Sequence, residues 1–343
     1  MTGDPTPTDA GGELFVPVVT GAARPDPRVL PAAPVTRFAP APTGFLHLGH
    51  LVNALYVWGI ARATGGRVIL RVEDHDRQRS RPEYEAALLD DLARLGLPPD
   101  EPPITVFRAG PTTHRQSDNG PAYGASLDRL RADGLVYACA CTRTTFAEWE
   151  AERGRAWRGI GCPGACREAA LDEGGAWGAT PAEPGLSLRV AIGAGSERWI
   201  DLLAGPLADE PAAGGDLLVR DRVGNWTYAF CVVVDDMADS VDLVVRGRDL
   251  LDATPAQLRL ARLLGRGTPP QFLHHPLVRR MSGQKLSKAE RDTAVREMLD
   301  AGATPADLFG RAARLAGLRE DDAPVEADAL GALFGGSWAT RSV

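Results

Sequence analysis

The chain has 343 residues, 44% of them hydrophobic, and a formal net charge of −7. This length and composition predict a buried core in one large domain or two smaller ones. The acidic balance excludes a globally basic nucleic-acid binder, so an RNA-binding surface would have to be a local basic patch. Because the sequence has neither a membrane-length apolar run nor a signal-peptide pattern, we expect a soluble, cytoplasmic protein without a membrane partner.

The first predicted elements form one βαβ unit. Residues 1–34 contain seven prolines and no sustained periodicity, which predicts an irregular leader pinned to the body near 14–16. A short strand over 35–39, a turn at 40–44, an apolar helix over 46–63 and a buried strand over 67–72 follow. Strand, helix and strand in this order predict a parallel sheet.

The rest of the chain alternates predicted helices with short extended segments. Helices are expected over 82–96, 121–133 and 254–264 and in the tail from Thr304, and strands over 186–192, 216–222, 226–235, 242–246 and 275–279. Continuous valine in 226–235 is typical of a strand buried on both faces. Thr254 followed by Pro255 is typical of an N-cap and a first helical position.

Only two of the 38 basic residues are lysines, Lys285 and Lys288, and they lie three positions apart. Chance survival on a solvated loop is one explanation. We favour a functional explanation, because a compact ammonium group does work that a wide planar guanidinium cannot.

Two histidines, His47 and His50, stand where the first predicted strand meets the following helix. At this spacing they share one helix face, and a helix N-terminus offers phosphate its free N–H groups and positive dipole end. Gly49 between them would let a nucleotide lie close to the backbone. Capping or surface histidines are the alternative interpretation, and we favour nucleotide binding.

Two charged residues follow predicted strands, at the edge where open parallel sheets bind ligands. Glu73 comes directly after 67–72, and its carboxylate suits a ligand ammonium group, although a capping acid or a surface ion pair fits equally well. Arg246 ends 242–246 before a glycine, and arginine grips a carboxylate through two parallel hydrogen bonds. Arg37 is a second candidate contact for a carboxylate or a phosphate.

Four of the five cysteines lie between 139 and 166. In a chain expected to be cytoplasmic, this clustering favours a metal over disulfides. Two close pairs, Cys139 with Cys141 and Cys162 with Cys166, suit one structural zinc ion held tetrahedrally by four thiolates. Free thiols are the alternative, because these two spacings are not the commonest.

The segment from Arg37 to His50 resembles the His-x-Gly-His element of class I aminoacyl-tRNA synthetases, in particular their glutamyl branch. The segment Lys285-Leu286-Ser287-Lys288 resembles the second ATP motif of that family, a loop that closes over the phosphates. The resemblance implies that ATP is a substrate, with Mg²⁺, and that Gly49 helps to bind it. It also implies that the two histidines and two lysines flank the α-phosphate while a carboxylate attacks it and pyrophosphate leaves.

For the amino acid, the resemblance implies L-glutamate. In the family, the residue matching Glu73 holds the substrate amino group, the one matching Arg246 binds the side-chain carboxylate, and the one matching Tyr228 lines the same pocket. The implied glutamate site also contains Arg37, Phe38, Ala39, Pro40 and Ala41. Ala41 stands where the family usually has a serine that contacts the amino acid, so the preference for glutamate over aspartate stays open.

One glutamyl-synthetase-like group carries zinc where this chain has its four cysteines, often with a tyrosine at the position of Cys162. Only 55 residues follow Lys288, fewer than a helical anticodon-binding region needs. This architecture is similar to the glutamyl-Q tRNA(Asp) synthetases, a family that activates glutamate without tRNA and transfers it to queuosine in the anticodon loop of tRNA(Asp). We therefore expect a monomeric ligase of this type.

The predicted fold is α/β, with the Rossmann-like parallel sheet of class I synthetases, helices on both faces, an inserted zinc-binding acceptor-type subdomain and a short helical C-terminal region. The expected parts are the leader 1–34, two halves of the catalytic domain over 35–135 and 216–290, the insertion 136–215 and the tail 291–343. Two other functions stay open: a tRNA-independent glutamate or aspartate activator that serves another acceptor, and a non-catalytic RNA-binding paralogue.

Overall fold

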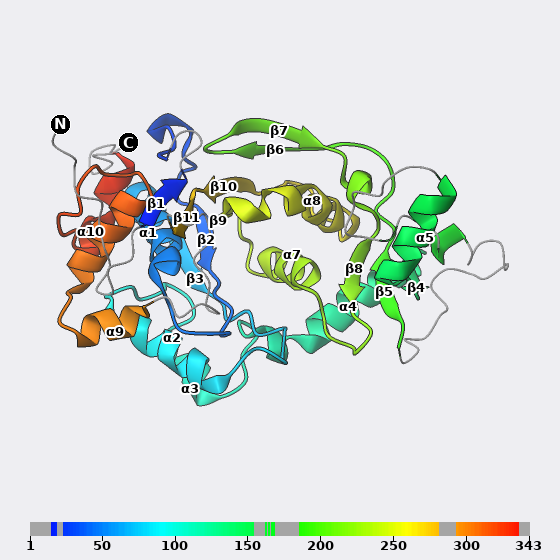
Figure 1. The fold of residues 1–343 in the computed structure, drawn as a ribbon, viewed down its shortest axis with the longest axis horizontal. Helices are drawn as coiled ribbons and strands as arrows, with labels where there is room; N and C mark the ends of the chain where they lie inside the picture. The colour runs from blue at the N-terminus through cyan, green and yellow to red at the C-terminus, as the bar shows by residue number, and fades with distance from the viewer. Residues whose placement is uncertain are drawn as a thin grey trace.

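The computed structural model describes residues 15–18, 23–153, 162, 164, 166–168, 185–280 and 293–335 of the chain. Its centre is a sheet of short strands that lie beside helix α1 (Figure 1). β2 (Val35–Phe38) pairs in parallel with β3 (Arg67–Leu70), and β9 (Leu243–Gly247) pairs in parallel with β10 (Gln271–His275). The predicted parallel βαβ unit is therefore confirmed, whereas β10 was not foreseen.

Asp242 joins the two strand pairs. Its N–H donates to Val35 O at 3.1 Å, and its carboxylate accepts from the Val35 N–H at 2.8 Å, so β2 and β9 lie side by side. Beyond β10 the sheet continues into β6 (Glu197–Asp201) and its antiparallel partner β7 (Gly205–Asp209). The leader strand β1 (Phe15–Val18) pairs with β11 (Leu277–Arg280), which confirms the expected attachment of the leader near this point.

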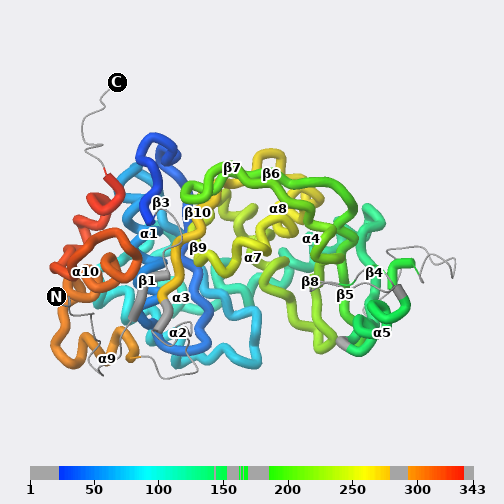
Figure 2. The backbone as a smooth tube through the Cα atoms, turned by 45° about the horizontal axis from the view of Figure 1, so that its top comes forward, coloured from blue at the N-terminus to red at the C-terminus, as the bar shows by residue number. Residues whose placement is uncertain are grey.

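Helix α1 (Leu48–Thr64) is buried over most of its length because its residues are apolar on all sides. It ends at Gly65, whose φ of 70° places it in the left-handed region that glycine adopts readily. α10 (Pro305–Leu315) and the 3₁₀ segment η6 (Ala327–Phe334) pack on α1 at one end of the molecule (Figure 2). Thr304 caps α10 by accepting a hydrogen bond from the Asp307 N–H, as its position before Pro305 predicted.

A second core lies at the other end of the molecule. It is built from α4 (Gly120–Ala132), α7 (Tyr228–Ala238), α8 (Thr254–Leu263) and an antiparallel sheet of β4 (Val136–Cys139), β5 (Ser187–Val190) and β8 (Leu217–Arg220). Among the described residues the other helices are α2 (Pro82–Arg94), α3 (Ile104–Ala109), α5 (Arg143–Arg153) and α9 (Val295–Asp300), with 3₁₀ segments η1 (Pro27–Val29), η2 (Gln116–Asp118), η3 (Pro211–Gly214) and η4 (Arg248–Ala253).

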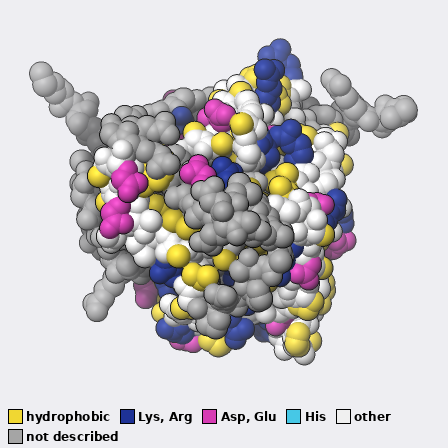
Figure 3. Space-filling model, turned by 90° about the vertical axis from the view of Figure 1, so that its right-hand side faces the viewer, with side chains coloured by type: hydrophobic (Ala, Val, Ile, Leu, Met, Phe, Trp, Pro, Cys, Tyr) yellow, Lys and Arg dark blue, Asp and Glu magenta, His cyan; other side chains and the backbone are white. Residues whose placement is uncertain are grey.

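The end of the molecule that carries β4 and α5 displays basic and acidic side chains interspersed over its described surface (Figure 3). This mixture agrees with the negative net charge. Within the part of the chain that the structure describes, no helix is both long enough and apolar enough to cross a membrane. The predicted boundaries of the leader, the two catalytic halves, the insertion and the tail stay a prediction.

The prediction of a strand over 226–235 was wrong, because this segment forms α7. Phe230 to Asp236 are all buried, and a helix that is buried on every side has the same continuous apolar pattern as a buried strand. The prediction of Thr254 as an N-cap was also wrong. The cap is Ala253, and the Thr254 hydroxyl accepts a hydrogen bond from Arg246 Nη2 at 2.8 Å instead.

Gly59 lets the C-terminal segment approach α1 closely. A Cβ built on Gly59 would overlap the ring of Phe334, which is itself fully buried. We predict that Gly59→Val lowers the free energy of unfolding by about 1–3 kcal/mol through overpacking, as measured by urea denaturation. In the matched control Gly124→Ala, nothing lies within 4 Å of the added Cβ, so stability should be unchanged or up to about 1 kcal/mol higher. Equal stability of Gly59→Val and the unmodified chain would contradict this packing.

Candidate active site

A cavity of about 510 Å³ opens at the C-terminal ends of β2, β9 and β10, the edge where open parallel sheets bind ligands. Its walls come from the turn after β2, the start of α1, the N-terminus of α7 and the corner between β10 and β11. The predicted ATP-site and glutamate-site residues found among its lining are Arg37, Phe38, Ala39, Pro40, Ala41, His47, Gly49, His50, Glu73, Tyr228 and Arg246. Lys285 and Lys288 lie outside the described residues.

Glu73 brings a buried carboxyl group to the cavity. It stands just beyond β3, its N–H donates to Pro40 O at 3.2 Å, and the residue is only 7% exposed. Burial raises the pKa of this carboxyl to about 7, although the charges of Arg71 and Arg37 act in the opposite direction. Among the described residues, no side chain donates a hydrogen bond to it, so a ligand cation would stabilise its ionised form.

Arg246, at the end of β9, is 5% exposed and is held by neutral groups. Its Nε donates to His274 Nε2 at 3.0 Å, its Nη1 to Gln257 Oε1 at 2.6 Å, and its Nη2 to Thr254 Oγ1 at 2.8 Å and to Leu250 O at 3.2 Å. Burial lowers the pKa of this guanidinium. No carboxylate within the described ranges forms an ion pair with Arg246, so its positive charge is not neutralised by a direct contact with them.

These contacts bear on the geometry that the sequence predicted for Arg246. A guanidinium has five N–H groups, and the described residues engage four of them. One N–H group, on Nη1, remains beyond these contacts, and a carboxylate bound through two parallel hydrogen bonds stays a prediction.

Arg37 differs from Arg246 because a carboxylate lies against it. Its Nε is 3.0 Å from Asp236 Oδ1, and its Nη1 donates to Val245 O at 3.1 Å. Asp236 thus compensates its charge, and these contacts tie β2 to α7 and β9. A direct role for Arg37 in binding a ligand stays a prediction.

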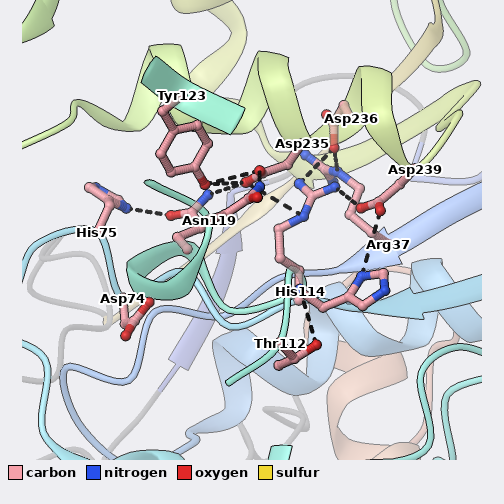
Figure 4. A network of polar contacts seen from close by, with 12 residues as sticks. Arg37, Asp74, His75, Thr112, His114, Asn119, Tyr123, Asp235, Asp236 and Asp239 are labelled. Atoms are coloured by element: carbon pink, nitrogen blue, oxygen red, sulfur yellow. Dashed lines mark hydrogen bonds and ion pairs between the residues drawn. The ribbon is translucent and has the colours of Figure 1, made fainter. Parts of the chain in front are cut away.

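The sequence reasoning did not single out Arg71, Asp235 and Asp236. Figure 4 shows Asp235 and Asp236 on neighbouring positions of α7, within a network of polar contacts. Arg71 is 1% exposed, and its guanidinium lies 2.7 Å from Asp236 and 2.6 Å from Asp239. Burial raises the pKa of Asp236, but Arg37 and Arg71 outweigh this effect and hold it below its usual range. Two adjacent acids at the end of an apolar run were the available signal.

Asp235 also anchors α7, through partners that differ from those of Asp236. Its carboxylate accepts hydrogen bonds from Gln116 Nε2 at 2.8 Å, Asn119 Nδ2 at 2.7 Å and the Tyr123 hydroxyl at 2.9 Å. Because α7 is fixed by two buried acids near its C-terminal end, its first residue, Tyr228, is held against the cavity.

The two histidines at the start of α1 have fixed hydrogen-bonding roles. The His47 Nδ1 accepts from the Gly49 N–H, and the His50 Nδ1 accepts from the His47 N–H, both at 3.1 Å. A ring nitrogen that accepts a backbone hydrogen bond carries no proton, so both neutral rings carry their proton on Nε2. Each neutral ring therefore carries its one N–H donor at Nε2.

Gly49 has a local role beyond the one that the sequence suggested. A Cβ on this residue would lie 2.9 Å from His47 Cε1 and 3.1 Å from its Nδ1. The missing side chain is therefore needed for the His47 ring to fold back onto the helix N-terminus. Close approach of a nucleotide to Gly49 stays a prediction.

The four predicted cysteines meet at the far end of the molecule from α10. The Sγ atoms of Cys139, Cys141, Cys162 and Cys166 all lie within 4.8 Å of one another. Sγ of Cys141 is 3.6 Å from that of Cys162 and 3.1 Å from that of Cys166. Sulfur atoms about 3.8 Å apart are expected around a tetrahedral ion with metal–sulfur bonds of about 2.3 Å, so this cluster has the size of a four-thiolate metal site.

Comparison with known proteins agrees with this geometry. Residues 34–322 match the family of tRNA synthetases class I (E and Q), catalytic domain, and the chain belongs to this family of ligases. It is 40% identical to the glutamyl-Q tRNA(Asp) synthetase of Symbiobacterium thermophilum over 299 residues, which cover 87% of this chain and 91% of that protein. The protein of the same name from Nitratidesulfovibrio vulgaris is 38% identical over 89% of this chain and 93% of its own length.

A solved structure is similar in fold. It is a glutamate tRNA ligase from Elizabethkingia meningosepticum in complex with its amino acid, with a TM-score of 0.67 and 23% sequence identity. The match covers 88% of this chain and 64% of that chain. The predicted class I synthetase fold is therefore confirmed.

The raised pKa of Glu73 predicts an unusual dependence of stability on pH. Between the ordinary pKa of 4.5 and about 7, the folded chain keeps the proton that the unfolded chain has released. Stability contributed by this group therefore falls as pH rises through that window. We predict that the free energy of unfolding of Glu73→Gln, relative to that of the unmodified chain, increases by up to about 3 kcal/mol when the pH is raised from 4.5 to 7.5. Urea denaturation at both pH values measures the difference, and a pH-independent difference would contradict the raised pKa.

Proposed function

We propose that this chain uses ATP to activate L-glutamate as glutamyl-adenylate and transfers the glutamyl group to queuosine in the anticodon loop of tRNA(Asp). The names of the two relatives support this reaction, since both are glutamyl-Q tRNA(Asp) synthetases. Membership of the class I family supports the use of ATP, with Mg²⁺ on its phosphates. We infer that the protein acts as a monomer.

The observation that carries this proposal is a buried carboxyl group and a buried guanidinium that line one cavity. Glu73 has a carboxyl group without a described hydrogen-bond donor, and Arg246 has a guanidinium with neutral partners. A buried charge without an opposite charge is costly. An acidic α-amino acid supplies both complements, because its ammonium group suits Glu73 and its side-chain carboxylate suits Arg246.

The N-terminus of α1 suits the other substrate. His47 and His50 each have an Nε2–H, and the helix end adds a positive dipole, so phosphate oxygens have donors on this side of the cavity. In the activation step the α-carboxylate of glutamate attacks the α-phosphorus, a P–O bond forms, and pyrophosphate leaves. We assign Lys285 and Lys288 the role of stabilising the negative charge that develops on the phosphates.

In the transfer step the acceptor attacks the glutamyl carbonyl carbon, the bond to AMP breaks, and AMP leaves. Tyr228 lines the same cavity as Glu73 and Arg246, so we place it beside the amino acid. Ala41 also lines the cavity, and its small side chain gives the substrate no hydroxyl group to bind. Selection for glutamate therefore rests on Arg246 in this proposal.

We assign one structural zinc ion to the four cysteines. The distances among the Sγ atoms fit a tetrahedral four-thiolate site. Arg189 Nε donates to Cys139 Sγ at 3.2 Å, and its positive charge would offset the negative charge of a zinc ion with four thiolates. Bound zinc would hold Cys162 and Cys166 against β4.

Amino-acid-dependent exchange of pyrophosphate into ATP, measured without tRNA over all twenty amino acids, tests the activation half. Glutamate should support strong exchange. Transfer of labelled glutamate should then occur to tRNA(Asp) that carries queuosine and not to the same tRNA without it. If none of the twenty amino acids supports exchange, the proposal is overturned and a non-catalytic paralogue is favoured. If glutamate is transferred only to another acceptor, the second half of the proposal is overturned.

Replacement of Arg246 gives a sharper test of the amino-acid site. We predict that Arg246→Gln raises KM for glutamate about 100-fold or more, because a buried charged hydrogen bond is lost, and changes KM for ATP by less than about twofold. Arg198→Gln is the matched control, because Arg198 is exposed on β6. Equal changes in both KM values would contradict the assigned role.

Metal content tests the cysteine site. We predict about one zinc ion per chain by elemental analysis of the purified protein. Cys139→Ser should lose this zinc and lower the thermal midpoint of unfolding, because a thiolate ligand is removed. Cys231→Ser is the control, since Cys231 lies in the second core and not in the cluster. Absence of zinc from a fully reduced, correctly folded protein would refute this assignment.

A further inference from the structure

A buried histidine–aspartate pair lies behind Arg246, and the reaction described above does not use it. His274, on β10, is 4% exposed, and its Nδ1 lies 2.6 Å from Asp201 Oδ2. Asp201 ends β6 and is 1% exposed. The same carboxylate accepts the His274 N–H at 3.2 Å on Oδ2, and the N–H groups of Leu203 and Ala204 at 2.9 Å on Oδ1.

These contacts fix where the protons lie. A carboxylate oxygen only accepts, so His274 carries its proton on Nδ1, and the Arg246 Nε–H then donates to the lone pair on His274 Nε2. Burial raises the pKa of Asp201, but its hydrogen bonds from His274, Ala204 and Leu203 lower it below its ordinary value. The pKa of His274 is lowered, chiefly by burial, although its bond to Asp201 opposes this shift. The pair is therefore an ionised aspartate with a neutral imidazole.

The neutral ring keeps Asp201 away from direct contact with Arg246. The ring accepts a hydrogen bond from Arg246 Nε and donates one to Asp201, so it orients the guanidinium without placing a carboxylate against it. Arg37 shows the alternative, since Asp236 lies 3.0 Å from its Nε and compensates its charge. Arg246 is thus held in one orientation while its positive charge remains available to a ligand.

We propose that Asp201 and His274 are positioning residues that give the cavity its selectivity for an amino acid with a side-chain carboxylate over the matching carboxamide, that is, L-glutamate over L-glutamine. Both side chains have an acceptor oxygen, but only the carboxylate has the charge that complements an unneutralised guanidinium. This inference rests on the proposed glutamate activation and adds two residues that do not line the cavity.

The near-isosteric variant Asp201→Asn tests this inference, because it should change the tautomer of His274. Two backbone N–H groups hold the oxygen at the Oδ1 position, so the new NH₂ group faces His274 Nδ1 and no longer accepts from the His274 backbone N–H. The ring then accepts at Nδ1 and carries its proton on Nε2, directly against the Arg246 Nε–H. KM for glutamate in pyrophosphate exchange should rise about 10- to 100-fold, the glutamate-to-glutamine ratio of kcat/KM should fall by a similar factor, and KM for ATP should change less than about twofold.

Asp209→Asn is the matched control, since Asp209 is an exposed aspartate on the neighbouring strand β7 and should behave like the unmodified protein. A second pair of variants separates positioning from general stability. His274→Gln can place an acceptor near the position of Nε2, whereas His274→Asn is too short to reach Arg246. The glutamine variant should therefore retain more selectivity than the asparagine variant, while a purely structural role would leave the ratio unchanged in both.

The outcomes separate this inference from the proposed function. If the unmodified protein shows no glutamate-dependent exchange, the proposed function fails. If it does, and folded Asp201→Asn keeps the original KM and selectivity ratio, this inference is overturned. Nitrogen-15 NMR of the unmodified protein is independent of all variants. It should find His274 neutral with its proton on Nδ1 at pH 7, and an imidazolium or a proton on Nε2 would overturn the inference.

Discussion

A buried ion pair at Asp236 links the two cores of the molecule. The Asp236 carboxylate is shared by Arg37 from β2 and Arg71 from the end of β3, at 3.0 and 2.7 Å. Breaking a buried ion pair of this kind costs about 3–5 kcal/mol, which is a large part of the stability of a typical domain. The position of α7, and with it that of Tyr228 on the cavity wall, depends on this contact.

The same network explains why three buried arginines near one sheet edge differ in what they can do. Arg37 and Arg71 lie against carboxylates, so their charges stabilise the fold. Arg246 lies against a neutral histidine, glutamine and threonine, so its charge is left for a ligand. The partner of each guanidinium, and not the residue type, therefore determines which positive charge is already compensated within the described residues.

Local sequence patterns predicted the βαβ unit, the gathering of the cysteines and the placement of Glu73 and Arg246 at the ends of strands, because each depends on short spacing or on the end of a strand. The resemblance to the synthetases, and not a local pattern, pointed to Tyr228 and to residues 38–41. They failed for 226–235, since a helix buried on every side lacks the periodicity that separates it from a strand. They did not single out Asp201 and His274, which are 73 positions apart and meet only through the pairing of β6 with β10. The roles of Lys285 and Lys288 stay predictions, because these residues lie outside the described ranges.

The central claim is that one cavity recognises an acidic amino acid at both ends, through Glu73 and Arg246. A crystal structure of the protein with bound L-glutamate tests it most directly. The account predicts the ligand ammonium group within hydrogen-bond distance of the Glu73 carboxylate and the side-chain carboxylate against the Arg246 guanidinium. A ligand bound in the reverse orientation, or at a place where it touches neither residue, would contradict the account.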